Sequence, residues 1–338
     1  MWVEAKVGED QMAKIIGNLV PADDFTHPLG PELNFNESMY FNFHDPLRQV
    51  GGFVRLGNRA NERRAEMTVT LYLPDGRVYF MFKRPEITHN DAFDAGGLKF
   101  EVLEPTQRLR THYRGSMLEM ARPREMADPK RAFTENPLRR VEIDLEHDAV
   151  GPIYGHSQDE SEQNRDAENQ FARAHYEQHM RIRGRIEIEG TPAIEIDGLG
   201  LRDHSWGPRH WQAIEGYEWL TMNFGADLGL MVSVIRRGDD QTRRGGVMIR
   251  AGHLEPLVEA TVEIDWEEGT PFHRALCVHA RTAAGESLEI TGRVLGFIPL
   301  RNRRGGTTTT IGEGLTEWRL GEQGGYGLSE LLRTEPAG

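Results

Sequence analysis

One short segment holds most of the side chains whose types could do chemistry. Residues 202–207 read Arg-Asp-His-Ser-Trp-Gly, so a cation, an acid, an imidazole and an indole are close neighbours. If the segment is a strand, its side chains alternate between two faces. Arg202, His204 and Trp206 would then share one face, and Asp203 and Ser205 the other. A bulge could re-aim Asp203, so the alternation is an expectation.

These residue types suit proton transfer on an apolar molecule. His204 can act as general acid or base near neutral pH, and Trp206 offers an apolar wall and a π-face for a developing cation. Arg202 could bind a carboxylate or enolate. Asp203 could orient His204, or donate a proton if it is buried. Acid-initiated hydration, dehydration, isomerisation or cyclisation needs such a set. A purely structural role, with Arg202 and Asp203 as a buried ion pair, stays open.

A second group of candidates lies about 25 residues earlier. Glu177 is a candidate second carboxylate facing the pocket. His175 and His179 are four residues apart, which places them on one face of a helix. Two such histidines could bind a metal with His204 or His210 as third ligand, but solvated histidines at a helix end are the favoured interpretation, and we predict no metal.

The elements that must position these residues are mostly strands. Period-two alternation of apolar and polar residues runs through several segments: 66–73, 140–145, 180–188, 258–266 and 288–294. Pro74-Asp75-Gly76 predicts a hairpin turn before a second strand at 78–82. Helical spacing predicts one short helix at 12–19, and the polar stretch 157–178 predicts a surface helix. One apolar and one wet face per strand is typical of antiparallel barrels or sandwiches.

Length and composition limit the class of protein. The chain has 338 residues, which favours two domains, and 38% of them are hydrophobic, which is enough for real cores. The net charge of −13 disfavours nucleic acid as a partner. We find no signal peptide and no stretch of ~20 apolar residues, so we expect no integral membrane segment and a cytoplasmic location.

Several cofactor classes lack the residues they need. The single cysteine, Cys277, cannot form an internal disulfide, a cysteine-based zinc site or an iron–sulfur cluster. No Gly-x-Gly-x-x-Gly follows a strand, and no Gly-Lys-Ser/Thr loop occurs, so no nucleotide cofactor is expected. Gly-x-Ser-x-Gly is also absent, which disfavours a hydrolase of that type. We therefore predict no cofactor.

The segment 198–207 resembles the Asp-His-x-Trp-Gly signature of carotenoid 1,2-hydratases (hydroxyneurosporene synthases) and their relatives, the tocopherol-cyclase-like proteins and fungal Diels–Alderases. Residues 37–41 resemble the Glu-x-x-Tyr strand that opens the first domain of this superfamily. Trp219 and residues 227–231 resemble the hairpin that opens the second. The resemblance is to a branch with an Arg-Asp-His-Ser-Trp-Gly signature.

The resemblance implies a mainly β protein of two lipocalin-like antiparallel β-barrel or sandwich domains with one or two short helices. We expect the first domain at 1–210, with the polar helical insertion at about 157–178, and the second at 211–338. The hydratases also use a Tyr and an Asp one strand after the signature. Tyr217 and Asp227 are nearby candidates, so the hydratase reaction itself is not carried over.

The predicted site combines residues from the motif with residues from the resemblance. We expect His204, Asp203 and Glu177 to be catalytic. We expect six residues to bind substrate: Trp206, Arg202, Glu37, Tyr40, Tyr113 and Tyr217. For Glu37 and Tyr40 the alternative is a hydrogen-bonded pair inside the first barrel.

The predicted function is a cofactor-independent acid/base enzyme, a hydratase/dehydratase, isomerase or cyclase, acting on a hydrophobic terpenoid-like or polycyclic molecule. A non-catalytic carrier of such a molecule is the alternative, and a structural adaptor is a third hypothesis. The clustering of ionisable groups with Trp206 favours an enzyme, because a carrier needs mainly an apolar lining. Self-association as a homodimer is left open.

Overall fold

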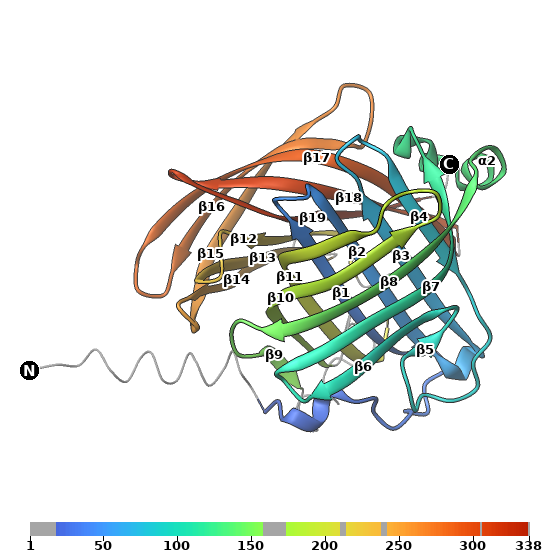
Figure 1. Cartoon of the computed structure of the whole chain (residues 1–338). Coiled ribbons are helices and arrows are strands. Elements are labelled where there is room, and N and C mark those ends of the chain that lie inside the picture. The colour runs from blue at the N-terminus through green and yellow to red at the C-terminus, as the bar shows by residue number, and fades with distance from the viewer. Residues whose placement is uncertain (1–17, 158–173, 210–213, 238–241, 305, 337–338) are drawn as a thin grey trace, which may run out of the picture.

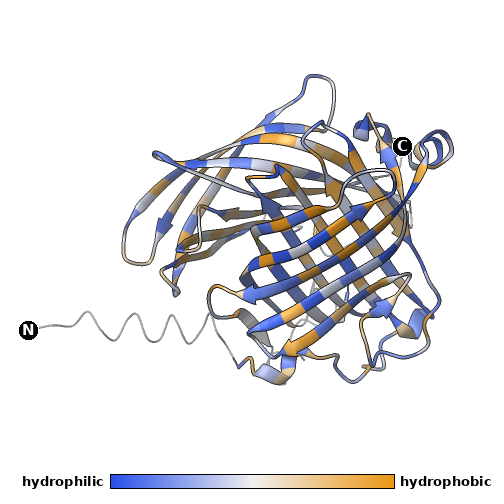
Figure 2. Ribbon diagram, viewed as in Figure 1, coloured by the Kyte–Doolittle hydropathy of each residue, from blue (hydrophilic) through white to orange (hydrophobic). Residues whose placement is uncertain are grey.

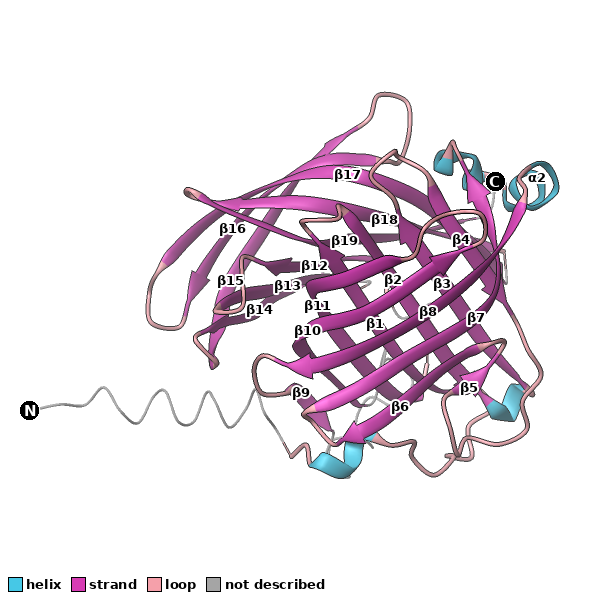
Figure 3. Ribbon diagram, in the orientation of Figure 1, coloured by secondary structure: helices cyan, strands magenta, loops and turns pink. Residues whose placement is uncertain are grey.

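The chain is almost entirely built of antiparallel strands (Figures 1 and 3). This computed structural model describes residues 18–157, 174–209, 214–237, 242–304 and 306–336. The described helical segments are short: η1 (Pro21–Asp24), η2 (Ala60–Glu62), η3 (Pro123–Ala127) and α2 (Pro129–Glu135). None of the described helices is long and apolar enough to cross a membrane.

The first sheet contains the strands before residue 209. They are β1 (Phe35–Asp45), β2 (Val50–Arg59), β3 (Arg64–Tyr72), β4 (Val78–Lys83), β5 (Asp94–Ala95), β6 (Leu98–Glu104), β7 (Arg108–Met120), β8 (Leu138–Ala149), β9 (Tyr154–Ser157), β10 (Ala174–Ile188) and β11 (Ile194–Pro208). Their order is β4-β3-β2-β1-β11-β10-β8-β7-β6-β5, and β9 pairs with β10. An additional pairing of β4 with β7 joins the sheet back on itself, and we call this ring the first barrel.

The remaining strands form a closed barrel in sequence order, the second barrel. They are β12 (Gly216–Asn223), β13 (Leu228–Arg236), β14 (Thr242–Arg250), β15 (His253–Trp266), β16 (His273–Thr282), β17 (Ser287–Arg304), β18 (Thr307–Leu320) and β19 (Gln323–Pro336). β12 and β19 pair and close the ring. The predicted fold class, mainly β with antiparallel barrels, is confirmed.

Alternation along the strands builds the cores (Figure 2). In β3, Met67, Val69 and Leu71 belong to the core of the first barrel, while the residues between them face outward. The predicted hairpin is confirmed, since β3 pairs with β4 across a turn in which Gly76 has φ +84°. That positive φ favours glycine because it has no Cβ.

The structure describes only small parts of the two predicted helices. The expected helix at 12–19 lies almost wholly outside the described residues. Of the expected helix at 157–178, residues 158–173 also lie outside them, but Ala174–Gln178 are the start of β10, so the prediction is wrong there. Polar residues at these positions are compatible with a strand because they hydrogen-bond to side chains of other strands, as Gln178 does with Arg202 and Glu177 with Trp219.

The two barrels share a buried apolar interface. Tyr72 and Phe53 of the first barrel belong to one core cluster with Ile298, Leu315 and Leu328 of the second. A second cluster joins residues of β11 with residues of β13 and β14. The outward face of β1, β10 and β11 therefore lies between the barrels.

Candidate functional site between the barrels

Strand β11 divides the Arg-Asp-His-Ser-Trp segment between two environments. Arg202 and His204 point into the first barrel, where both contact Tyr176 of β10. Asp203 points the other way and pairs with His175. Ser205 lies on the same side as Asp203. The predicted alternation is confirmed, and no bulge interrupts the β10–β11 or β1–β11 register here.

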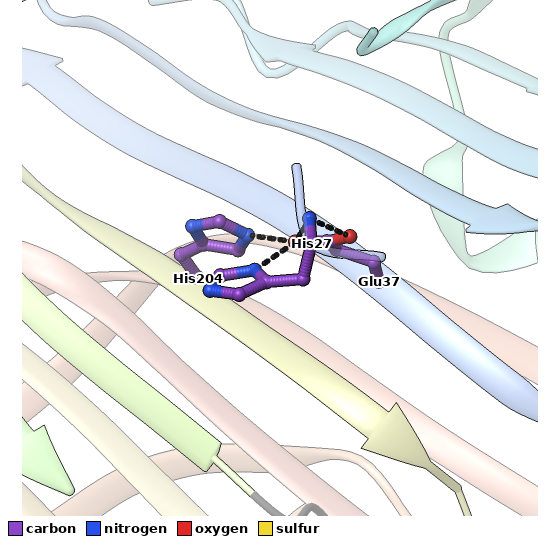
Figure 4. Close-up of side chains that lie close together, drawn as sticks. All are labelled: His27, Glu37 and His204. Atoms are coloured by element: carbon purple, nitrogen blue, oxygen red, sulfur yellow. Dashed lines mark hydrogen bonds and ion pairs between the residues drawn. The ribbon is translucent and has the colours of Figure 1, made fainter. Parts of the chain in front are cut away.

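Inside the first barrel, His204 belongs to a closed hydrogen-bond network. Its Nε2 lies 3.0 Å from Glu37 Oε1, and its Nδ1 lies 3.2 Å from the Tyr176 hydroxyl. His27 Nδ1 lies 2.6 Å from the same Glu37 oxygen (Figure 4). The His27 ring stacks on Trp206 with ring centroids 3.9 Å apart. Both nitrogens of His204 are thus occupied by protein groups.

A buried ion pair lies next to this network. Arg202 Nη1 donates to Asp24 Oδ1 at 2.7 Å, and the two side chains are 0% and 1% exposed. Arg202 Nε donates to Gln178 Oε1 at 2.8 Å, and the Tyr176 hydroxyl also donates to Asp24. Burial alone would raise the pKa of Asp24, but Arg202 and the other donors lower it. The ion pair fixes η1 against the barrel wall.

Glu37 is the electrostatic centre of the network. Burial alone would raise its pKa, but hydrogen bonds from His204 and His27 lower it to about 2. Glu37 and His204 are both fully buried. The network therefore has a structural role, since it anchors residues 21–27 to the first barrel. Neither ring nitrogen of His204 is free to bind a substrate.

The other face of β10 and β11 carries a second group of ionisable residues. His175 Nε2 forms an ion pair with Asp203 and lies 3.4 Å from Glu177 Oε1. Trp219 Nε1, on β12, donates to the same Glu177 oxygen at 2.7 Å. The His175 and Asp203 side chains keep 30% and 19% of their surface exposed. We call these four residues the interdomain cluster and include Tyr217, which lies on the same face of β12 as Trp219 and bonds to Glu330, the cross-strand partner of Trp219.

The charges of the Asp203–His175 pair stabilise each other. Burial would lower the pKa of His175, but the charges and hydrogen bonds of Asp203 and Glu177 together raise it to about 10. Burial would raise the pKa of Asp203, but His175 lowers it. At neutral pH this site therefore presents a carboxylate beside an imidazolium.

Aromatic side chains border the interdomain cluster. Trp219 contacts Tyr40 edge-on, with ring centroids 5.2 Å apart. The Tyr217 hydroxyl donates to Glu330 of β19. Burial raises the pKa of Tyr40 and of Tyr217 well above the usual value, so both phenols are neutral. The arrangement combines a base, a cation and neutral donors with flat apolar walls.

A groove of about 410 Å³ opens along the same interface. Its lining includes His44, Leu199, Asn223 and Tyr326, from β1, β11, β12 and β19. Leu199 and Asp203 lie on the same face of β11, four residues or about 13 Å apart. The groove therefore lies on the same interface, but none of the five residues of the interdomain cluster lines it.

A family model described as "Domain of unknown function (DUF7064)" matches residues 20–335. The chain belongs to this family. No curated protein matches its sequence. The roles of individual residues in this chain are therefore argued from its own geometry.

Solved structures with the same fold cover nearly the whole chain. A Nitrosomonas europaea protein described as an AttH candidate has a TM-score of 0.62 at 18% identity, covering 93% of this chain and 96% of its own. CghA has a TM-score of 0.56 at 11% identity, covering 96% and 97%. Kievitone hydratase from Nectria haematococca has a TM-score of 0.53 at 11% identity, covering 95% and 96%. At these identities the likeness shows the shared fold alone.

Several residues predicted for one site lie in different places. His204, Trp206, Arg202 and Glu37 meet inside the first barrel, whereas Asp203, Glu177, Tyr40 and Tyr217 lie between the barrels. The alternative interpretation, a hydrogen-bonded Glu37–Tyr40 pair, is excluded because the two residues point to opposite faces of β1. Tyr113 is in the first-barrel core, where its hydroxyl donates to Ser116 O at 3.2 Å. Asp227 is exposed in the turn before β13.

Two sets of side chains place ligand-type atoms close enough for a metal: His27, Glu37 and His204, and His175, Glu177 and Asp203. In the first set the Glu37 oxygens already accept hydrogen bonds from the His27 backbone N–H at 3.1 and 2.9 Å. In the second set the Asp203–His175 ion pair occupies the ligand atoms. The predicted helix with His175 and His179 is wrong, since both histidines are on strand β10 and His179 Nδ1 lies 3.0 Å from Asn223 Oδ1.

Several residues of both networks are not predicted from the sequence. Asp24 and His27 precede the first strand and have no pattern that assigns them to the barrel interior. Tyr176 falls within the stretch whose polarity predicts a helix. Glu313 and Glu330 belong to no motif, although a turn at residues 321–322 would place them opposite each other in a hairpin.

Proposed function

We propose that this chain is an enzyme that transfers protons on a hydrophobic small molecule bound between the two barrels. The observation that carries the proposal is the partly exposed Asp203–His175 ion pair. Glu177 links this pair to Trp219, because it contacts His175 and accepts a hydrogen bond from the Trp219 indole. The proposed reaction classes are hydration or dehydration, isomerisation, and cyclisation. Asp203 replaces His204 as the proposed catalytic base, because His204 is held in a closed network.

The chemistry of the cluster fits such a reaction. His175 keeps Asp203 ionised, so Asp203 can accept a proton from a carbon or from water. In a dehydration, the C–H electron pair would form the new C=C bond, the C–O bond would break, and the hydroxyl would leave as water after it gains a proton. Hydration is the reverse. Trp219 would stabilise positive charge developing on the carbon.

Two observations support an apolar, ring-containing ligand. Aromatic side chains border the cluster, and a groove of about 410 Å³, lined by other residues of the same interface, shows that the barrels leave space for a small ligand between them. One protein that shares the fold is named a hydratase, which agrees with water addition or removal as one of the proposed reactions. The terpenoid-like or polycyclic character of the ligand follows from the resemblance described in the sequence analysis.

Proton transfer can be measured before the natural substrate is known. The hydrophobic molecules that co-purify with the protein are identified by mass spectrometry and incubated with the enzyme in D₂O. Wild type should introduce deuterium into one of them. With Asp203→Asn, the rate of deuterium incorporation should fall at least about 100-fold. Asp144→Asn, which removes a carboxylate from the exposed pair with Arg110, is the matched control and should keep the wild-type rate.

The same experiment tests the alternative of a carrier. A molecule that binds wild type and Asp203→Asn equally, and that gains no deuterium with either protein, would contradict the enzyme proposal and support a carrier.

A further inference from the structure

A pair of carboxyl groups lies across the interface from Asp203. Glu313 of β18 and Glu330 of β19 are direct cross-strand partners. Both face the first barrel, because their neighbours Leu315 and Leu328 belong to the apolar interface cluster. Glu313 is 4% exposed, and Glu330 is half-buried. Like charges directly opposite each other on a sheet repel, and burial strengthens the repulsion.

The immediate partners of this pair do not neutralise it. Within the described ranges, no ion pair joins either carboxyl to a cation. The Tyr217 hydroxyl donates to Glu330 Oε1, and the Tyr72 hydroxyl donates to the backbone oxygen of Glu313 at 3.1 Å. Glu313 Oε2 is buried without a hydrogen-bond partner. Two ionised carboxylates in this place would lack compensation.

The wider surroundings allow a count of charges. The titratable and charged groups that act on the pair are Tyr40 of β1, Arg55 of β2, Tyr72 of β3, Asp203 of β11 and Tyr217 of β12. Farther away, Arg209 acts on Asp203 and Tyr217, and His175 of β10 pairs with Asp203 and contacts Glu177. Among these described residues, Arg55, Arg209 and His175 are the cations. Four carboxyl groups, including the pair, stand against these three cations. Arg59, which also acts on Arg209, is paired with Glu62, so one of the four carboxyl groups has no cation to compensate it.

We propose that Glu313 and Glu330 share one proton at neutral pH and that Glu330 is the proton donor of the interdomain site. This inference rests on the proposed function and supplies the acid that Asp203, as base, requires. Glu330 is the member of the pair in contact with Tyr217 of the cluster, and Glu313 is the buried partner that holds the proton in place.

The electrostatics agree with this assignment. Burial, followed by the charge of Glu330, raises the pKa of Glu313 well above its usual value. Burial also raises the pKa of Glu330; hydrogen bonds from Tyr217 and Glu313 oppose it, and the charge of Asp203 adds to it. The interface therefore holds a carboxylate and a carboxylic acid close together, which is a recurrent arrangement for acid–base catalysis.

The proposed step keeps the charge of the cluster constant. In a dehydration, Asp203 takes the proton from carbon while Glu330 gives its proton to the departing hydroxyl, which leaves as water. The carbon–hydrogen electron pair becomes the C=C bond, and the C–O electron pair stays with oxygen. One carboxyl gains a proton and another loses one, so no net charge is created in the interface. Proton return from Asp203 to Glu330 through water closes the cycle.

The infrared C=O stretch of protonated carboxyl groups tests the shared proton without any ligand. Wild-type protein at pH 7.5 should show the band of a buried protonated carboxyl. The double variant Glu313→Gln/Glu330→Gln should lose it, while Glu317→Gln on the same strand, which is paired with Arg293, should keep it. Glu313→Gln alone should shift the titration of the band to lower pH, because the repulsion is gone. Gln keeps the shape and hydrogen-bonding capacity, and circular dichroism checks the fold.

Absence of the band in wild type, or its persistence in the double variant, would overturn the inference. The donor role is tested by Glu330→Gln in the D₂O assay, where deuterium incorporation should fall by at least about 100-fold. Full incorporation by Glu330→Gln would refute the donor role and leave the proposed function standing. No incorporation by wild type would refute the proposed function, while the infrared result would still decide whether the proton is shared.

Discussion

Asp203 and His204 are adjacent in the chain but belong to separate chemical environments. His204 has both ring nitrogens within hydrogen-bond distance of buried protein groups, whereas Asp203 pairs with a partly exposed histidine. The residue chosen from the sequence as acid/base thus differs from the one that the geometry favours. Polar types in a conspicuous motif indicate importance, but their access to a ligand depends on the face of the strand.

At the residue scale, we predict that Arg202→Met strongly destabilises the fold. It leaves Asp24 buried without its cationic partner, which should cost about 3–5 kcal/mol of unfolding free energy in denaturant titrations. Arg181→Met removes one partner of an exposed pair, with side chains 40% and 58% exposed, and should cost no more than about 1 kcal/mol. Equal effects of the two variants would show that the Asp24–Arg202 pair is not structural.

Also at this scale, Glu37 should make stability depend on pH in the acid range. Its pKa is about 2 in the folded chain and 4.5 as the ordinary value. A lowered pKa gives stability that is present above pH 4.5 and is lost as the pH falls toward 2. Glu37→Gln should remove about 3 kcal/mol of this acid dependence, measured as unfolding free energy against pH. If the unfolding free energy of Glu37→Gln fell as steeply between pH 4.5 and 2 as that of wild type, Glu37 would not be the source of the acid dependence.

At the scale of elements, period two was enough to predict many strands. The hairpin of β3 and β4 and the alternation within β11 could be read from residue types alone. The start of β10 could not, because Ser157 to Gln178 is polar on both faces and contains a helix-capping pattern. The closure of each sheet and the strand order depend on long-range pairing, which local patterns do not encode.

Close strand contacts at glycine give a prediction for an element. A Cβ at Gly200 of β11 would lie 1.8 Å from the backbone oxygen of Asn42 in β1. Gly200→Ala should therefore push these strands apart and lower the unfolding free energy by about 1–3 kcal/mol. Gly324→Ala is the control, since no atom lies within 4 Å of its added Cβ, and its effect should stay within about 0.5 kcal/mol. The reverse order would contradict the close approach of β1 and β11 at Gly200.

At the scale of the molecule, the site depends on how the barrels meet. The sequence favoured two β-domains and placed the Arg-Asp-His-Ser-Trp segment near the end of the first. It could not show that one face of that segment forms the interface, or that Glu313 and Glu330 approach it from the second barrel. Those contacts join residues more than 100 positions apart.

The shared interface should make the two barrels unfold together. Leu315 and Tyr72 pack in one buried cluster across it, so separation exposes apolar surface on both sides. We expect one cooperative transition in calorimetry, with the same midpoint in tryptophan fluorescence. Leu315→Asp, which introduces a charge into the cluster, should lower the midpoint and separate two transitions. Two transitions in wild type would contradict a shared core.

The position of a bound molecule decides whether the site lies between the barrels. A crystal structure of the protein with the hydrophobic molecule that co-purifies with it gives that position. We predict that the molecule lies between the barrels, against Trp219 and within hydrogen-bond distance of Asp203 or Glu330. A molecule found inside the first barrel, against Trp206 and His204, would show that the proposed site is wrong.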